Sequence, residues 1–145
     1  MMKTLNLFYR WLLPAVFTCL ITACHTSNSA HENLNGKFAI IQMGDFSRSQ
    51  LEDVNAQINF QDFPASKISF GCNHIAFHSQ TDATHKLELL NIRTTMMYCQ
   101  DNVQNQMEQY FGDHAERVNR YQIHGDELRL LQDNNLIITA MKLTR

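Results

Sequence analysis

The sequence predicts a mainly β domain of the α+β class: a curled antiparallel sheet, or a partly closed small β-barrel, with one inserted helix near residues 101–116. Three observations support this prediction. Over most of the chain after residue 55, hydrophobic residues alternate with polar ones, which is the period of half-buried strands. One segment has a helical period instead. Outside an N-terminal leader and a polar linker, about 110 residues remain, which is the size of one domain with a modest core.

Two short runs predict the first strands. In "AQINFQ", Ile58 and Phe60 alternate with polar residues, and in "SKISF" Ile68 and Phe70 do the same. Between these runs, "QDFPAS" has the composition of a turn around Pro64. The two runs therefore predict a pair of neighbouring strands.

After Gly71 the hydrophobic positions change from even to odd, since Ile75 and Phe77 follow Phe70. A shift of one residue turns every later side chain to the opposite face of a strand unless a bulge or turn absorbs it. We therefore expect a backbone irregularity at residues 71–73.

Further strands are predicted in "HKLELLNI", in "RTTMMYC" and in the C-terminal run "RYQIHGDELRLLQDNNLIITAMKL". In the last of these, "HGD" and "QDNN" interrupt the pattern at hairpin spacing, which predicts three successive strands. The total is seven or eight strands. The methionines of "TTMMY" could form a soft binding surface, but methionine in an alternating strand more often fills the core, which is the interpretation we favour. The large side chains expected to point inward are those of Phe60, Phe70, Phe77, Met96, Tyr98 and Phe111.

One helix is predicted by a stripe of residues that share a helical face. Asp101, with Gln104 three positions later, resembles a capping arrangement at its start. We expect Tyr110 and Phe111 to belong to the core before they belong to any partner surface. The stripe consists of Val103, Met107, Tyr110, Phe111 and His114.

The first 23 residues have the layout of a lipoprotein signal peptide. Lys3 and Arg10 precede an apolar run of eleven residues, "WLLPAVFTCLI", which is shorter than the roughly 20 residues of a membrane span. The following "ITAC" resembles a lipobox, so we expect Cys24 to be lipidated; ordinary cleavage and an uncleaved anchor remain as alternatives. Because His25 rather than aspartate follows the cysteine, we expect an outer-membrane anchor with the domain facing the periplasm.

The rest of the chain divides into a lipidated tether, residues 24–35, and a domain, residues 36–145. "CHTSNSAHENLN" is polar without an apolar repeat, which is typical of a flexible tether. Once Lys3 and Arg10 leave with the leader, ten Lys plus Arg face fourteen Asp plus Glu, a net charge of −4. Phosphate binding needs a clustered basic face, and because none is evident we expect no nucleic-acid partner.

No catalytic, metal or cofactor site is expected, and we predict that the protein is not an enzyme. His74 and His78 would lie about 13 Å apart on a strand, too far to share a metal ion. Cys72 would need a histidine base held by a third polar group before it could act as a nucleophile, and Asn73 and His74 are only its neighbours in sequence.

Two cysteines are left to pair with each other. Cys19 is discarded with the leader and Cys24 carries the lipid, so Cys72 and Cys99 are the remaining thiols. An oxidising envelope favours pairing where the geometry allows it. We predict a structural Cys72–Cys99 disulfide; the alternative is two buried free thiols.

Four motifs follow one another within roughly residues 34 to 143: "GCNHIAF", "IRTTMMYC", "MEQYF" and "YQIHGDELRLL". Together and in this order they resemble the landmarks of the META domain family, which includes the heat-shock protein HslJ. The resemblance implies a small β-rich, HslJ-like envelope domain linked to stress, antibiotic tolerance or secretion. The resemblance implies no catalytic residues.

Two functions remain open. The first is a non-enzymatic, lipid-anchored module that contacts another envelope protein through a sheet edge or the side of the helix. The second is a carrier of a small apolar ligand, for which a continuous apolar cavity of about 300 Å³ or more would be needed. Because the large inward side chains should fill the interior, we favour the interaction module. A charged patch near the last hairpin, formed by Arg117, Arg120, Asp126 and Glu127, is expected to be a solvated surface.

Overall fold

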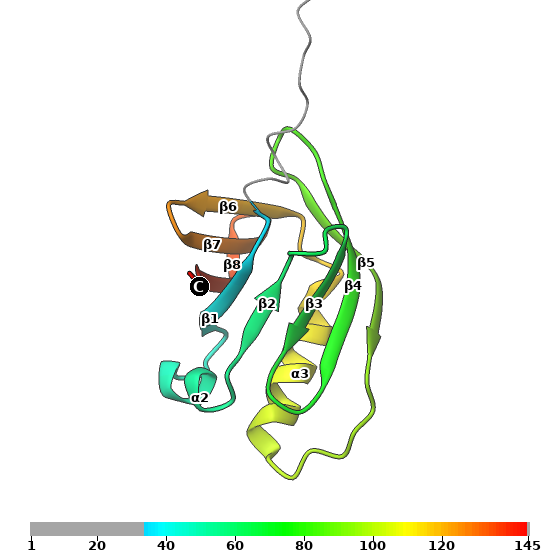
Figure 1. The fold of residues 1–145 in the computed structure, drawn as a ribbon, viewed down its shortest axis with the longest axis vertical. Helices are drawn as coiled ribbons and strands as arrows, with labels where there is room; N and C mark the ends of the chain where they lie inside the picture. The colour runs from blue at the N-terminus through cyan, green and yellow to red at the C-terminus, as the bar shows by residue number, and fades with distance from the viewer. Residues whose placement is uncertain (1–33, 145) are drawn as a thin grey trace, which may run out of the picture.

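Eight antiparallel strands form one strongly curled sheet in the computed structural model, which describes residues 34–144 (Figure 1). The expected leader and Cys24 lie outside the described residues. The elements are β1 (Lys37–Met43), α2 (Arg48–Asp53), β2 (Gln57–Asn59), β3 (Ala65–Ser69), β4 (His74–Thr81), β5 (Leu87–Thr94), α3 (Asn102–Ala115), β6 (Arg120–His124), β7 (Glu127–Gln132) and β8 (Asn135–Lys142).

The sheet is a half-barrel with the order β5-β4-β3-β2-β1-β8-β7-β6. The predicted fold class and strand number are therefore confirmed, including the three successive C-terminal strands. The separate strand predicted in "RTTMMYC" is wrong, because pairing ends at Thr94, the last residue of β5, and β1 was not predicted. Helix α3 lies on the concave side of the sheet, behind β3 and β4 in Figure 1. In the part of the chain that the structure describes, no helix is long and apolar enough to cross a membrane.

The two outer strands, β5 and β6, approach each other along what we call the seam. At one end of the seam the main chain joins them: the Leu87 N–H donates to the Asn119 carbonyl at 3.2 Å, and the Tyr121 N–H donates to the His85 carbonyl at 3.0 Å. Beyond this end the two strands separate, and the chain after β5 leads into α3. The barrel is thus closed at one end of the seam only.

A row of aromatic rings fills the concave side. Neighbouring rings of Phe38, Phe60, Phe77 and Phe111 lie 6.0 to 6.4 Å apart between centroids, and Phe70 is 6.2 Å from Phe111. All five side chains are buried, four of them as predicted. Edge-on and tilted contacts of this kind add to the stabilisation that burial of the rings provides. The row connects β1 to α3 across the interior.

Two serines interrupt this apolar interior. Ser66 on β3 and Ser79 on β4 are 4% and 1% exposed, and their hydroxyl oxygens lie 2.9 Å apart. The Ser66 hydroxyl also donates to the Pro64 carbonyl at 3.5 Å. Each buried hydroxyl therefore has a hydrogen-bond partner.

The predicted helix is confirmed as α3, and its cap differs in one detail from the expectation. The Asp101 side chain accepts a hydrogen bond from the Val103 N–H at 2.8 Å. Gln104 lies against Gly71 rather than completing a capping box. Met107 and Phe111 are buried and Tyr110 is half-buried, so this face belongs mainly to the core.

A second helix, α2, was not predicted. Its start carries a complete capping box: the Ser47 side chain accepts from the Gln50 N–H, and the Gln50 side chain accepts from the Ser47 N–H. This Ser-x-x-Gln signature is visible in the sequence. The helix is only six residues long, and just Leu51 is buried, which leaves almost no hydrophobic period to detect.

The predicted irregularity at residues 71–73 is a hairpin turn. Residues 70–73 connect β3 to β4, with Ser69 paired to His74 and Gly71 at a φ of 92°. The inward residues change from even-numbered to odd-numbered positions here because β4 is a separate strand that runs back along β3. A register shift does occur in β5, opposite Ala76 and His78, where Asn91 has a φ of 54°.

Candidate interaction surface

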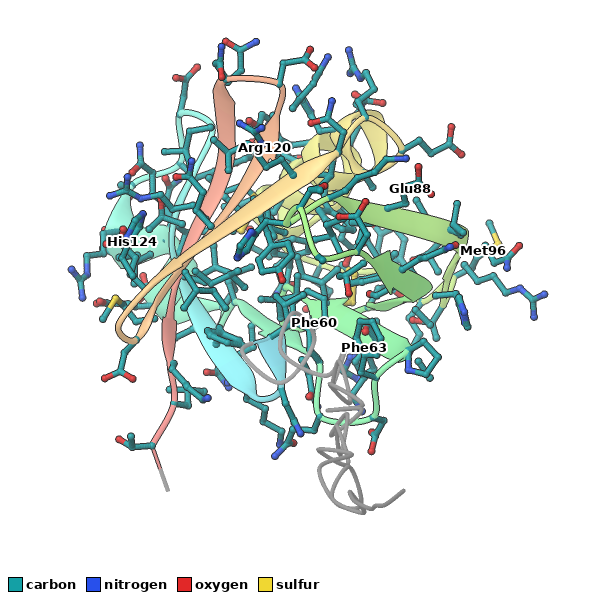
Figure 2. The ribbon with its side chains drawn as sticks, turned by 90° about the horizontal axis from the view of Figure 1, so that it is seen from above. Phe60, Phe63, Glu88, Met96, Arg120 and His124 are labelled. Carbon is teal, nitrogen blue, oxygen red and sulfur yellow. A yellow bond between two sulfur atoms is a disulfide. The ribbon has the colours of Figure 1, made fainter. Side chains whose placement is uncertain are left out.

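The expectation that Met96 and Tyr98 point into the core is wrong. Their side chains are 94% and 93% exposed, and that of Met97 is 57% exposed. The ladder between β4 and β5 ends at the Ile75–Thr94 pair, so these residues run past the last strand pairing. In Figure 2, Met96 lies at the rim of the molecule whereas Phe60 lies inside it. We call residues 96–98 the Met96–Tyr98 segment.

The side chain of Asn73 takes the place of a neighbouring strand for this segment. Its Oδ1 accepts the Met97 N–H at 2.9 Å, and its Nδ2 donates to the Met97 carbonyl at 3.2 Å. An amide side chain thus pairs with both main-chain groups of one residue, as a peptide unit of a strand would. Asn73 is only 4% exposed, so these bonds are shielded from water.

Glu108, on α3, holds Asn73 in place. Glu108 Oε1 accepts the main-chain N–H of Asn73 at 3.2 Å, and Oε2 accepts from its Nδ2 at 3.0 Å. The helix therefore fixes the turn, and the turn fixes the segment. Hydrogen bonds to an ionised carboxylate are stronger than those between neutral groups.

The disulfide joins the same parts covalently. The structure contains the Cys72–Cys99 bond that the sequence predicts, with sulfurs 2.04 Å apart and Cα atoms 5.9 Å apart. Before the segment, the Thr95 N–H donates to the His74 carbonyl at 3.1 Å. The Met96–Tyr98 segment is therefore held on both sides, by Thr95 at its start and by Cys99 at its end.

The backbone of the segment has two different edges. The N–H groups of Thr95 and Met97 are bonded to the turn, which is the inward edge. In residues 34–144, the N–H and carbonyl groups of Met96 and Tyr98 have no hydrogen-bond partner. Successive peptide groups of an extended chain point in opposite directions. Met96 and Tyr98 therefore present an unpaired strand edge to solvent.

The other residues considered from the sequence do not form a site. His74 and His78 are both exposed on the outer face of β4, and no cluster of three or more metal-ligating side chains occurs among the described residues. The predicted charged patch is not assembled. Arg120 pairs with Leu131, at the opposite end of the hairpin from Glu127. Glu127 bonds to Arg129 instead, and Arg117 donates to the Asp113 carbonyl.

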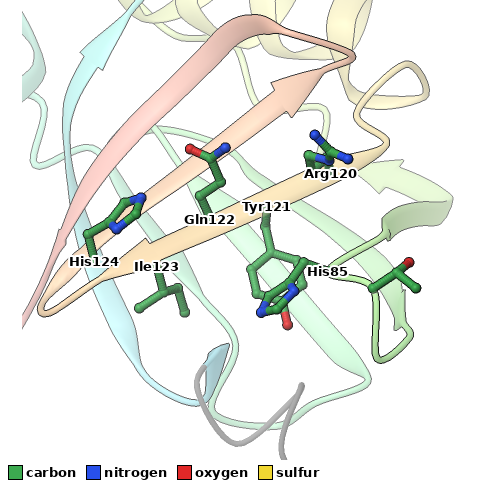
Figure 3. Close-up of a pocket in the computed structure, with 7 residues that line it drawn as sticks. His85, Arg120, Tyr121, Gln122, Ile123 and His124 are labelled. Carbon is green, nitrogen blue, oxygen red and sulfur yellow. The ribbon is translucent and has the colours of Figure 1, made fainter.

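A groove of about 360 Å³ runs along β6 beside the closed end of the seam (Figure 3). Tyr121, Ile123 and His85 lie on one side of the strand and Arg120 lies on the other. The His85 and Tyr121 ring centroids are 5.3 Å apart. Burial, and then the charge of Asp82, raise the pKa of Tyr121 above its ordinary value. The groove is open and has a mixed polar and apolar lining, so it differs from the apolar cavity that a carrier would need.

Comparison with known proteins places these features in a family and a fold. The sequence matches the profile of the family described as META domain over residues 32–143. No curated protein matches the chain. An NMR structure of a protein from Burkholderia xenovorans is similar, with a TM-score of 0.61 and 17% identity, over 80% of this chain and 88% of that one.

Two further solved structures share the fold. A second NMR structure has a TM-score of 0.61 at 11% identity, covering 78% of this chain and 94% of the other. A crystal structure of a DUF4847 family protein from Bacteroides vulgatus has a TM-score of 0.53 at 13% identity, covering 77% and 94%. At such identities these likenesses describe the fold alone.

Proposed function

Because this chain belongs to the META domain family, with a match that spans residues 32–143, we propose that it is a non-enzymatic interaction module of the bacterial envelope. In this proposal Cys24 carries the lipid that anchors the protein to the outer membrane, the residues between Cys24 and the buried Leu34 are the tether, and the domain faces the periplasm. The role we propose is in stress or antibiotic tolerance, through contact with a protein partner.

The observation that carries the proposal is the exposure of Met96, Met97 and Tyr98 on a fixed backbone. A flexible loop could hide such side chains, but here Asn73 and the disulfide hold them outward. Exposed apolar groups gathered at one place usually mark a binding surface. Tyrosine and methionine are also enriched at protein interfaces. The segment therefore has the composition and the rigidity of a docking surface.

The chemistry of the cysteines supports the non-enzymatic part of the proposal. Cys72 and Cys99 are joined to each other, so neither supplies a thiolate nucleophile. The carrier alternative has no observation in its favour. The aromatic row fills the concave side, and the groove along β6 is open to solvent.

A photo-crosslinking amino acid in place of Tyr98, in cells that make the full chain, tests the binding surface. We expect a discrete crosslinked protein product from position 98. A matched probe in place of Lys67, which is exposed on the outer face of β3, is the control. Equal crosslinking from positions 98 and 67 would contradict the proposal that the Met96–Tyr98 segment is the binding surface.

Metabolic labelling with a fatty acid tests the anchor separately. We expect label on the wild-type chain and none on Cys24→Ser, because the proposed lipid is attached to that sulfur. The acyl chains stabilise membrane binding by about 0.8 kcal/mol for each buried CH₂. An unlabelled wild-type protein would overturn the anchoring proposal and leave the binding surface to be judged on the crosslinking result.

A further inference from the structure

We propose that the occupant of this surface is a second copy of the chain, whose Met96–Tyr98 segment pairs with the first in an antiparallel, two-fold symmetric arrangement. The inference rests on the proposed function, since it names the partner of the same docking surface. It begins from the unpaired edge. The outward N–H and carbonyl groups of Met96 and Tyr98 are satisfied most fully by another extended strand.

The segment is complementary to itself. If the two-fold axis passes beside Met97, then Met96 lies directly opposite Tyr98 of the second copy, and Tyr98 lies opposite its Met96. In an antiparallel ladder, residues whose main-chain groups face each other exchange two hydrogen bonds. The two residues with free outward groups are therefore the two that meet, and the four bonds of the pair use all four outward N–H groups.

The side chains fit the same register. Met96 and Tyr98 of the second copy would stand side by side on one face, and a methionine sulfur beside an aromatic ring is a favourable cross-strand contact. On the other face, Met97 would meet its own symmetry mate. Side chains that are now 94%, 57% and 93% exposed would each become partly covered by a cross-strand neighbour.

Charge complementarity supports the second copy over an unrelated strand. The register that pairs residue 96 with residue 98 also places residue 93 near residue 101 of the second copy, although the chain bends at Gln100 before it reaches Asp101. Arg93 is exposed and has no ion-pair partner among the described residues, and Asp101 is exposed at the start of α3. The long Arg93 side chain could therefore meet Asp101 at each end of the paired segment, the two pairs being related by the two-fold axis.

The expected association is weak in solution. The paired stretch is short, which places the interface at the small end of the range for specific complexes, below about 1,200 Å². Two copies anchored in one membrane would meet at a higher effective concentration than two free copies. The dimer would therefore form readily at the membrane and dissociate on dilution.

A matched pair of substitutions separates strand pairing from simple hydrophobic contact. Both Met96→Ala and Met96→Pro remove the methionine side chain, but only proline also removes the outward N–H. That N–H has no partner within the described chain, so the two variants should have similar unfolding midpoints. Among the described residues, the buried core runs from Leu34 to Ala140, so the chain without its expected leader keeps every described core residue and is used for these measurements.

Sedimentation velocity over roughly 1 μM to 1 mM measures the dimer dissociation constant. We expect Met96→Pro to dissociate about 10-fold more readily than Met96→Ala, because two of the four intermolecular bonds are lost. Asp101→Asn retains a good helix cap and should weaken the dimer at low salt only. Equal constants for the alanine and proline variants, or a wild-type monomer throughout, would overturn the inference.

Oxidative crosslinking tests the register directly. Met97→Cys should form an intermolecular disulfide, because residues on the axis have Cα atoms about 4.5 Å apart, within the range a disulfide spans. Thr94→Cys lies about 20 Å from its own mate in this register and should not. Equal crosslinking of both variants would contradict the pairing. A cellular product from position 98 whose mass differs from twice that of the chain would overturn the second copy as occupant and leave the proposed function standing.

Discussion

The two ends of β5 are held by different chemistry. At its start, main-chain hydrogen bonds from Leu87 and Tyr121 join the chain directly to the neighbourhood of β6. At the other end, the amide of Asn73 and the Cys72–Cys99 bond hold the chain after β5. Because main-chain pairing uses the N–H and carbonyl groups at the first of these ends, few such groups remain there for another strand to bind. We call Asn73 and the Cys72–Cys99 bond the clip. The clip satisfies the inward edge alone, and the outward edge at Met96 and Tyr98 stays available for another strand.

The comparison also indicates where stability and binding are located. The end closed by main-chain bonds contains buried residues such as Leu87 and Tyr121, each with no exposed surface. The clipped end places three exposed side chains on a covalently fixed frame. We therefore expect substitutions in the clip to change stability, and substitutions in the segment itself to change association without changing stability.

The largest effect is expected when the disulfide is removed. Replacing Cys72 and Cys99 together by alanine opens a loop whose ends are 27 residues apart in sequence. On the chain-entropy account this lowers the free energy of unfolding by about 3.5 kcal/mol. Urea unfolding of the double variant and the wild-type chain gives the value. A loss below about 1 kcal/mol would indicate that the clip depends on hydrogen bonds alone.

The next effect concerns the amide of the clip. Asn73→Ala leaves the Met97 N–H and the Glu108 carboxylate without their partner in a shielded place, and we expect a loss of about 2 to 3 kcal/mol. Asn59→Ala is the control, because Asn59 accepts only the Gln61 N–H at an exposed site. Urea unfolding of both variants compares them, and hydrogen exchange at Met97 should accelerate in Asn73→Ala. Similar losses for the two variants would contradict the role given to Asn73.

At the closed end, stability should depend on alkaline pH through Tyr121. Burial and the charge of Asp82 raise its pKa above the ordinary 10.0. The unfolded chain therefore loses this proton first, so the contribution of the group is complete below pH 10 and is lost as the pH rises through the folded-state value. Unfolding measured from pH 8 to pH 11 should show a shallower decline in Tyr121→Phe than in the wild-type chain.

Tyr110 supplies the comparison for that measurement. Burial, followed by the charge of Asp45, raises its pKa too, so part of the decline should persist in Tyr121→Phe and become smaller when Tyr110→Phe is added. If the single variant declines as steeply as the wild-type chain, burial at the closed end does not control the ionisation of Tyr121.

The smallest effect on stability is expected in the segment. Met96→Ala and Tyr98→Ala remove side chains that are 94% and 93% exposed, and each should change the free energy of unfolding by less than about 0.5 kcal/mol. Phe111→Ala, at a position with no exposed surface, is the control and should cost about 3 to 5 kcal/mol. A large loss in either segment variant would mean that these side chains pack within the domain.

Most strands, helix α3 and the disulfide could be predicted because each depends on a local or countable signal. Alternation specifies strands such as β3 and β4, and the stripe from Val103 to His114 specifies the helix. The disulfide prediction followed from the number of cysteines that would be left if the leader were removed and Cys24 carried a lipid. Periodicity does not reveal where a neighbouring strand ends, however. The alternation continues through Met96 and Tyr98 although β4 no longer accompanies them, so their exposure was not predictable.

The part of the site that sequence reasoning missed is the clip. Asn73 and Met97 are 24 residues apart, and Asn73 and Glu108 are 35 apart, so no sequence window contains the network. The one available signal was indirect. The motifs that carry the family resemblance include both "GCN" and "MEQYF", and the structure shows that Asn73 from the first bonds to Glu108 from the second.

The buried pair of Ser66 and Ser79 limits how this sequence can drift. Changing Ser66 alone to alanine leaves the Ser79 hydroxyl in the interior without its 2.9 Å partner, at a cost of about 1 to 3 kcal/mol, whereas changing Ser79 alone leaves the Ser66 hydroxyl its bond to the Pro64 carbonyl. Changing both together removes that demand, and such paired replacements are often neutral or stabilising. The low-cost route between a polar and an apolar version of this pair therefore changes Ser79 first or both serines together, because a change of Ser66 alone is the unfavourable intermediate.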